Sequence, residues 1–124
     1  MLFAVLNLPA QWSDITPKNV GEKLFAVYFT APDTGYIVGW GSSRSVFMRT
    51  INGGNTWDIQ SLVGIYLFNV TVVNNKEIYL SGYTSKGLCG MVTKSTDGGS
   101  SFNETDFDEL INPFSFGIMN FLKK

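Results

Sequence analysis

Apolar and polar residues alternate along most of the chain in short runs, which are separated by clusters of turn-forming residues. Alternation with a period of two, in runs rich in β-branched and aromatic residues, is typical of strands with one buried face. No window has the 3.6-residue period of a helix. The pattern predicts eight strands in two groups of four, at about residues 24–30, 35–40, 45–50 and 56–61, and then 66–73, 77–82, 90–95 and 101–105.

The second group of strands repeats the first. The segment Thr50–Trp57 (Thr-Ile-Asn-Gly-Gly-Asn-Thr-Trp) aligns with Ser95–Phe102 (Ser-Thr-Asp-Gly-Gly-Ser-Ser-Phe) at an offset of 45 residues. Trp12, Trp57 and Phe102 are spaced by the same interval. An internal period of this length, with four short strands in each copy, is typical of the blades of a β-propeller.

The strands ahead of these segments repeat as well, at an offset of 43 residues. Tyr36 aligns with Tyr79, and Gly39 aligns with Gly82. After the second copy, Phe114–Phe121 alternates like the first strand of each copy. The sequence therefore predicts an all-β fold, a partial β-propeller with two four-stranded antiparallel blades plus the first strand of a third.

A tight hairpin between the third and fourth strands carries the most specific signal of each copy. Two glycines supply the positive φ angles that a tight reversal needs. The side chain of Asn52 or Asp97 can accept hydrogen bonds from turn amides, and the hydroxyl of Thr50 or Ser95 can tie the strand to the same turn. The aromatic residue that follows anchors the hairpin, so we expect two sheets packed face to face with Trp57 buried between them.

Both segments resemble the Asp-box, or bacterial neuraminidase repeat, of pattern Ser/Thr-x-Asp-x-Gly-x-Thr-Trp/Phe. The frame of Gly35–Gly39 ahead of Arg49–Gly54 is most similar to photosystem II stability/assembly factor-type repeats, which are common in exported bacterial proteins. The resemblance covers residues 12 to about 121, with Asn52 in place of Asp in the first copy. It implies a structural turn far from any active site, formed by Thr50, Asn52, Gly53, Gly54 and Trp57, and by Ser95, Asp97, Gly98, Gly99 and Phe102.

The repeats divide the chain into five segments. Residues 1–10 form either the remnant of a signal peptide cleaved after Ala10 or an ordinary strand, because no Lys or Arg precedes this apolar run. A signal peptide would make the protein periplasmic, cell-surface or extracellular. The other segments are the end of a preceding repeat or a lead-in (11–23), blade 1 (24–65), blade 2 (66–112) and the start of blade 3 (113–124). Because fewer than about three repeats rarely bury enough surface, we expect an oligomer or further blades to close the ring.

Composition excludes most catalytic chemistry. The chain has no histidine, a net charge of −1 and a single cysteine, Cys89, without a basic neighbour. A Ser-His-Asp triad, a Cys-His dyad and a zinc–histidine site are therefore impossible within these 124 residues. No basic block marks a nucleic-acid surface, and no apolar run reaches the length of a membrane span. We expect no catalytic residues, no metal, no cofactor, no nucleic acid and no membrane span.

Two sharper hypotheses compete with a purely structural role of the repeats. Asp-boxes occur in sialidases, whose site needs three arginines, but the chain has only Arg44 and Arg49. It would then be a fragment of a sialidase-like glycoside hydrolase whose catalytic residues lie in missing blades. Calcium binding by the acidic segment Asp97–Glu109 is less favoured than a solvated loop, because Phe102 stands where an EF-hand needs glycine.

The remaining hypothesis is a non-catalytic binding or assembly module of an exported bacterial protein. Propellers present loops at the two ends of the blade ring, and partners dock there. The aromatic residues on or near such loops are Tyr28, Tyr36, Trp40 and Tyr83. Trp40 and Arg44 are the first candidates for contact with a protein or glycan partner, and the alternative is that Trp40 packs between the blades.

Overall fold

The computed structural model describes residues 11–18, 20–86 and 90–106, which form strands and no helix. The strands are β1 (Lys23–Phe29), β2 (Gly35–Trp40), β3 (Ser45–Thr50), β4 (Asp58–Leu62), β5 (Ile65–Val72), β6 (Ile78–Thr84), β7 (Gly90–Ser95) and β8 (Asn103–Asp106). The eight strands expected from the alternation are confirmed, with ends displaced by no more than two residues. The strand expected at Phe114–Phe121 and the thiol of Cys89 lie outside the described residues.

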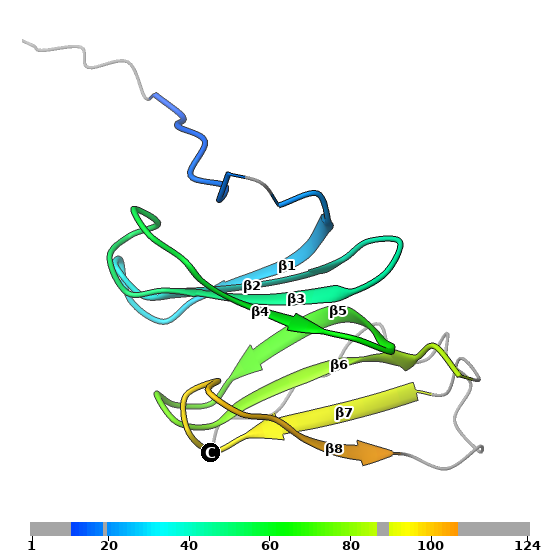
Figure 1. Ribbon diagram of the computed structural model, residues 1–124. Helices are drawn as coiled ribbons and strands as arrows, with labels where there is room; N and C mark the ends of the chain where they lie inside the picture. The colour runs from blue at the N-terminus through cyan, green and yellow to red at the C-terminus, as the bar shows by residue number, and fades with distance from the viewer. Residues whose placement is uncertain (1–10, 19, 87–89, 107–124) are drawn as a thin grey trace, which may run out of the picture.

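Each group of four strands forms one antiparallel sheet in which neighbours in sequence are neighbours in space. Blade 1 has the order β1-β2-β3-β4, and blade 2 has the order β5-β6-β7-β8. The sheets stack face to face, with β5 lying against β1, β2 and β3 (Figure 1). Short connections between adjacent antiparallel strands favour this meander. The two four-stranded antiparallel blades expected from the sequence are thus confirmed.

The hydrophobic core lies between the two blades. Alternation turns one face of each strand toward the other sheet, and burial of these faces stabilises the stack. The core side chains are Tyr36, Val38 and Phe47 of blade 1, and Ile65, Leu67, Val70, Val72, Ile78, Leu80 and Met91 of blade 2. Tyr36, expected near a loop, is a buried member of this core, and its ring lies 6.1 Å from that of Phe47.

A buried hydroxyl also joins the two blades. Ser45 Oγ, at the start of β3, donates to the carbonyl oxygen of Ile65 at 2.6 Å and accepts from the amide of Leu67 at 3.1 Å. Both backbone groups belong to β5, across the junction. Because these groups have left water, the hydroxyl supplies the hydrogen bonds that they would otherwise lack. Strand β5 is therefore tied to blade 1 by polar as well as apolar contacts.

Trp57 does not lie between the two blades, and the expectation for it was wrong. It is half-buried, and its Nε1 donates to the carbonyl oxygen of Ile15, ahead of blade 1, at 3.0 Å. Its repeat equivalent, Phe102, fills the junction instead, with its ring 5.0 Å from that of Phe47. The aromatic residue of each turn packs against the part of the chain that precedes its own blade. Trp57 therefore contacts the segment ahead of blade 1, whereas Phe102 contacts blade 1.

The first strand of each blade contains a bulge at the same place. The pairing register shifts around Phe25 in β1 and around Phe68 in β5. A bulge bends its strand and redirects the side chain of the extra residue. It also brings the strand backbone close to its neighbour, so that a Cβ on Gly82 would lie only 1.8 Å from the carbonyl oxygen of Tyr66. Gly39 is crowded in the same way, which explains why glycine occupies this position in both copies.

Candidate protein-binding surface

The Asx-Gly-Gly turn between β3 and β4 is closed by side-chain hydrogen bonds. Thr50 Oγ1 accepts from the amides of Asn52 and Gly54, at 3.3 and 2.9 Å. Asn52 Oδ1 accepts from the amide of Thr56 at 2.9 Å, and Asn52 Nδ2 donates to Thr56 Oγ1 at 2.7 Å. Gly53 and Gly54 have φ angles of 66° and 89°, which glycine adopts without strain. The polar groups of the motif therefore bond within the turn itself.

The turn between β7 and β8 repeats this network with a carboxylate in place of the amide. Ser95 Oγ donates to Asp97 Oδ1 at 2.7 Å and accepts from the amide of Gly99 at 2.8 Å. Asp97 Oδ1 accepts from the amide of Ser101 at 2.9 Å, and Oδ2 accepts from Ser101 Oγ at 2.6 Å. Hydrogen bonds from Ser101, and then from Ser95, hold the pKa of the Asp97 carboxyl well below its usual value. The ionised form of Asp97 is thus the one that stabilises the turn.

Replacing Asp97 by asparagine is expected to preserve this turn and to remove part of its pH dependence. An asparagine can donate to Ser101 as Asn52 donates to Thr56 in the first turn. Because folding lowers the pKa of Asp97, its stabilising contribution is present above the unfolded pKa of about 3.9 and is lost as the pH falls further. The Tm advantage of the wild-type protein over D97N should therefore shrink between about pH 5 and about pH 2.

Thermal melts followed by circular dichroism across this pH range measure the difference. Asp97→Ala is the matched variant, because it removes the hydrogen bonds as well as the charge. Its Tm at neutral pH should lie below that of D97N. A constant Tm difference between wild type and D97N over the whole range would contradict an ionised turn residue at this position.

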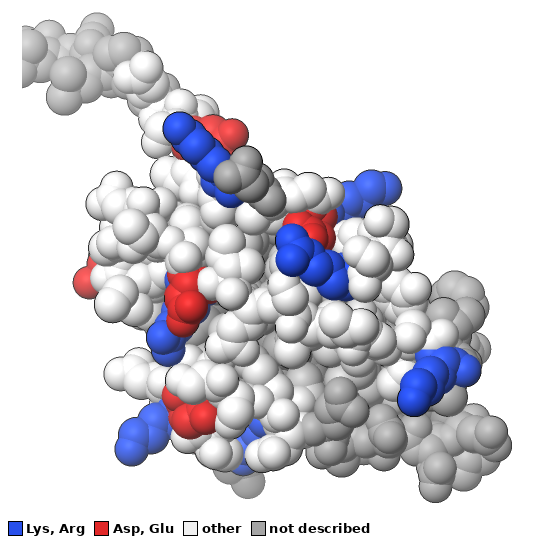
Figure 2. Space-filling model, in the orientation of Figure 1, with Lys and Arg blue, Asp and Glu red and all other residues white. Residues whose placement is uncertain are grey.

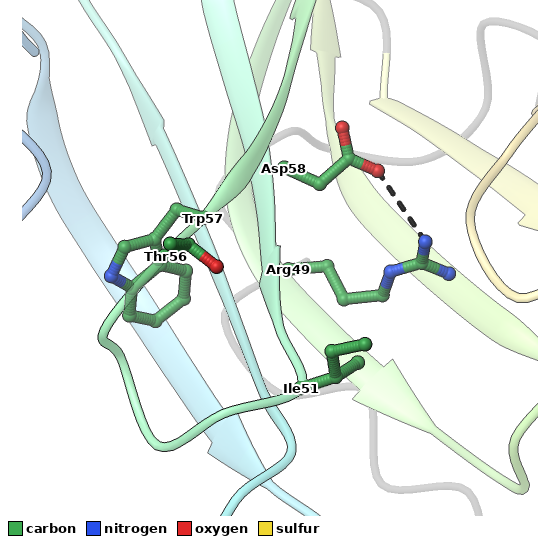
Figure 3. Close-up of a pocket in the computed structure, with 5 residues that line it drawn as sticks. All are labelled: Arg49, Ile51, Thr56, Trp57 and Asp58. Atoms are coloured by element: carbon green, nitrogen blue, oxygen red, sulfur yellow. Dashed lines mark hydrogen bonds and ion pairs between the residues drawn. The ribbon is translucent and has the colours of Figure 1, made fainter.

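An open hollow of about 340 Å³ lies beside the first turn, and Figure 3 shows the residues that line it. Its lining residues are Arg49, Ile51, Thr56, Trp57 and Asp58. Arg49 Nη2 lies 3.4 Å from Asp58 Oδ2, and its Nη1 donates to the carbonyl oxygen of Gly98 in blade 2 at 2.7 Å. The guanidinium is therefore held by both blades. The one carboxylate of the lining is paired with Arg49, so this hollow presents no pair of acid and base for catalysis.

Five aromatic side chains meet at the end of the blade junction that the strand pairing places opposite to the Asx-Gly-Gly turns. We call them the aromatic cluster: Phe25, Trp40, Tyr66, Phe68 and Tyr83. The rings of Phe25 and Trp40 are stacked, with centroids 5.5 Å apart and planes at 2°. Trp40 meets Tyr66 edge to face at 5.1 Å, and Phe68 lies 4.8 Å from Tyr83. Rings in these arrangements attract one another beyond the effect of area burial alone.

The two bulges build this cluster, because they hold Phe25 and Phe68 at equivalent places in neighbouring blades. Phe25 is exposed, and the other four rings are half-buried. Of the five, sequence reasoning singled out only Trp40 and Tyr83. For Phe25 and Phe68, the signal in the sequence was that they align with each other in the two copies. Each follows a residue that pairs with an aligned glycine, Gly39 or Gly82.

Trp40 and Arg44, the expected partner contacts, lie at either end of the connection between β2 and β3. The Trp40 ring contacts rings of both blades, as the alternative expectation had it. Arg44 pairs with Glu22, and its guanidinium holds the pKa of the Glu22 carboxyl below its usual value. Arg44 Nη1 also donates to Ser61 Oγ at 3.0 Å. These bonds fix the loop beside the aromatic cluster.

On the face in Figure 2, charge does not mark a second candidate surface, because acidic and basic side chains lie in small groups on a mostly uncharged surface. Among the described ion pairs, Lys94 Nζ lies 2.5 Å from Glu77 Oε1. Within the described ranges, no group of three His, Cys, Asp or Glu side chains could hold a metal ion. The same ranges contain no helix with the length and apolarity that a membrane crossing needs.

The family model described as Photosynthesis system II assembly factor YCF48 matches residues 6–119. The chain belongs to this family. The resemblance that the turns and the strands ahead of them indicated is thus confirmed. The match to the YCF48 family begins well ahead of β1, so it includes the segment 11–18. No curated protein gives a match to the sequence.

One solved structure, described as YCF48 bound to D1 peptide, is similar to this YCF48-family chain. The two share 20% sequence identity, with a TM-score of 0.56 over 73% of this chain. A likeness at this level shows the fold, which is a β-propeller, and the partial propeller expected from the sequence is confirmed. The chain covers 28% of that structure's length, so it spans little more than a quarter of this relative.

Proposed function

We propose that this YCF48-family chain is a non-catalytic module that binds a segment of another protein. The aromatic cluster at the blade junction is the observation that carries the proposal. Exposed aromatic side chains are enriched where proteins bind one another, and they supply much of the binding energy there. The assembly-factor family, and the D1 peptide to which the solved relative is bound, support a protein partner.

The cluster suits a protein segment because its exposed ring is already held in place. Stacking on Trp40 fixes Phe25, so little side-chain entropy is lost when a ligand covers it. The neighbouring loop is fixed by the bonds of Arg44 to Glu22 and Ser61. An apolar side chain of the partner that covers Phe25 and Phe68 would remove apolar area from water without ordering a loop. The geometry therefore favours binding through a few rigid aromatic contacts.

Replacing Phe25 by alanine is expected to weaken binding of a synthetic D1 peptide by about tenfold, which corresponds to roughly 1.4 kcal/mol. Phe29→Ala is the matched control, because Phe29 belongs to the same strand and both side chains are 44% exposed. Phe29 lies outside the aromatic cluster, so its replacement should leave the affinity unchanged. Isothermal titration calorimetry on both variants and on the wild-type chain measures the effect.

Circular dichroism first checks that both variants are folded. Equal weakening by Phe25→Ala and Phe29→Ala would argue against the aromatic cluster as the binding site. Absence of binding by the folded wild-type chain would argue against this peptide as a ligand of the two blades.

A fragment of a sialidase-like hydrolase is the competing proposal, and it has less support. Both arginines already have partners: Arg44 pairs with Glu22, and Arg49 pairs with Asp58 and the Gly98 carbonyl. A carboxylate substrate would have to displace these groups.

The blade limits 24–65 and 66–112, and the export of the protein, stay predictions from the sequence.

A further inference from the structure

The first Asx-Gly-Gly turn contains the one Asn-Gly pair of the sequence, Asn52–Gly53. An asparagine loses its side-chain amide most readily when glycine follows it. Glycine has no Cβ, so its backbone nitrogen can come close to the asparagine side chain. Asparagine is for this reason one of the thermolabile residues of proteins. Asn52 and Gly53 are both exposed, so water reaches them as well.

Deamidation of such a pair requires only water. The backbone nitrogen of Gly53 bonds to Cγ of Asn52 while the Cγ–Nδ2 bond breaks, and ammonia leaves with the proton of the Gly53 amide. The succinimide ring that results takes up one water molecule. Cleavage of its bond between nitrogen and Cγ leaves aspartate. Cleavage of its bond between nitrogen and the backbone carbonyl carbon leaves isoaspartate, in which the main chain runs through Cγ.

In the folded turn, three hydrogen bonds hold the side-chain amide of Asn52. Its Oδ1 accepts from Thr50 Oγ1 at 3.0 Å and from the amide of Thr56 at 2.9 Å. Its Nδ2 donates to Thr56 Oγ1 at 2.7 Å. These bonds fix the rotamer of Asn52, so a rotation that brings Cγ to the Gly53 nitrogen has to break them.

The attacking nitrogen is held as well. The Gly53 N–H donates to the carbonyl oxygen of Asp33, in the turn between β1 and β2, at 2.8 Å. The nitrogen has to lose this proton in order to attack, and the bond to the carbonyl oxygen retains the proton. Blade 2 has the same bond, from Gly98 to the carbonyl oxygen of Lys76, at 3.0 Å. Both reacting groups of the pair are thus occupied as long as the turn is closed.

The second turn shows that aspartate fits the position of Asn52. Asp97 Oδ1 accepts from the amide of Ser101 as Asn52 Oδ1 accepts from the amide of Thr56. Asp97 Oδ2 accepts from the Ser101 hydroxyl, so the Thr56 hydroxyl could donate to an aspartate at position 52 in the same way. Isoaspartate does not fit, because it adds an atom to the main chain and displaces the amides that follow.

We propose that Asn52 is a site of spontaneous deamidation that the closed turn protects. Opening of the turn between β3 and β4 frees both reacting groups, and Asn52 is then converted to aspartate and isoaspartate. The conversion to aspartate gives the first turn the carboxylate that the second turn already has. The aromatic cluster and its partner take no part in this reaction.

Incubation of the purified chain in mildly alkaline buffer tests the proposal, with the products at position 52 separated by chromatography and identified by peptide mass spectrometry. Asn52 should be retained in the folded wild-type chain and lost in urea. Thr56→Ala removes the acceptor of Asn52 Nδ2. It should accelerate the conversion in the folded chain by about threefold to tenfold, the factor that corresponds to one hydrogen bond of usual strength.

Thr56→Ser is the matched control, because serine keeps the hydroxyl, as Ser101 does in the second turn. It should convert as slowly as the wild type when folded, and all three chains should convert at one rate in urea. The proposal is overturned by equal rates for the folded wild type and Thr56→Ala, or by a folded wild type that converts as fast as the unfolded chain. Retention of Asn52 in urea would also overturn it. So would a rate in Thr56→Ala that rises in step with the globally unfolded fraction, because the protection would then belong to the whole fold.

Discussion

Replacing Phe47 by alanine is expected to lower the free energy of unfolding by about 3–5 kcal/mol, the usual cost of removing a buried phenylalanine ring. Phe47 is buried in the blade junction, where its ring meets those of Tyr36 and Phe102 at 6.1 and 5.0 Å. Its edge also lies against Gly99 of the second turn. Loss of the ring would leave a cavity that touches both blades.

Equilibrium unfolding in urea measures this loss for Phe47→Ala. Ile51→Ala is the matched control, because Ile51 follows the end of the same strand and is exposed. The control should change the free energy of unfolding by no more than about 0.5 kcal/mol. Similar losses for the two variants would mean that the blade junction is not the main source of stability.

Replacing Gly82 by alanine is expected to be nearly as damaging, at about 3 kcal/mol or more, although it adds a single methyl group. The new Cβ would lie 1.8 Å from the Tyr66 carbonyl oxygen and 2.8 Å from its carbonyl carbon. Both are backbone atoms of β5, so no side-chain rotation relieves the clash. The strand must move away, and the bulge that holds Phe68 in the aromatic cluster must change with it.

Gly21→Ala is the control for this substitution, because no atom lies within 4 Å of the added Cβ. Its free energy of unfolding should stay close to that of the wild type. Gly39→Ala should behave like Gly82→Ala, since its Cβ would lie 2.2 Å from the carbonyl oxygen of Lys23. A well-tolerated alanine at either position would be inconsistent with the bulges.

The strands and the turns could be predicted because both are specified locally. Alternation fixes which side of a strand is buried, and the Asx-Gly-Gly segments need the hydrogen bonds of neighbouring residues only. The equivalence of Thr50 with Ser95, and of Asn52 with Asp97, extends from the sequence to individual hydrogen bonds.

The errors concern how one sheet lies on the next, which local patterns do not specify. Alternation predicts that Trp57 packs against a neighbouring sheet, but it does not say whether that sheet precedes or follows. The aromatic cluster depends on the bulges at Phe25 and Phe68, which interrupt the alternation by one residue each. Tyr83 and Trp40 could be found as loop aromatics, whereas the contacts of Phe25 and Trp40 with rings of blade 2 require the stacking of the two blades.

Stacked repeats are stabilised by the contacts between nearest neighbours. The Ser45 hydroxyl adds a polar term to the coupling between blades 1 and 2, because it bonds two backbone groups of β5. The residue 45 positions later is Gly90, which has no hydroxyl. Blade 2 therefore cannot offer the same bonds to a blade on its far side. The bonds of Ser45 thus oppose the separation of blade 2 from blade 1, and we expect the two blades to unfold as one cooperative unit.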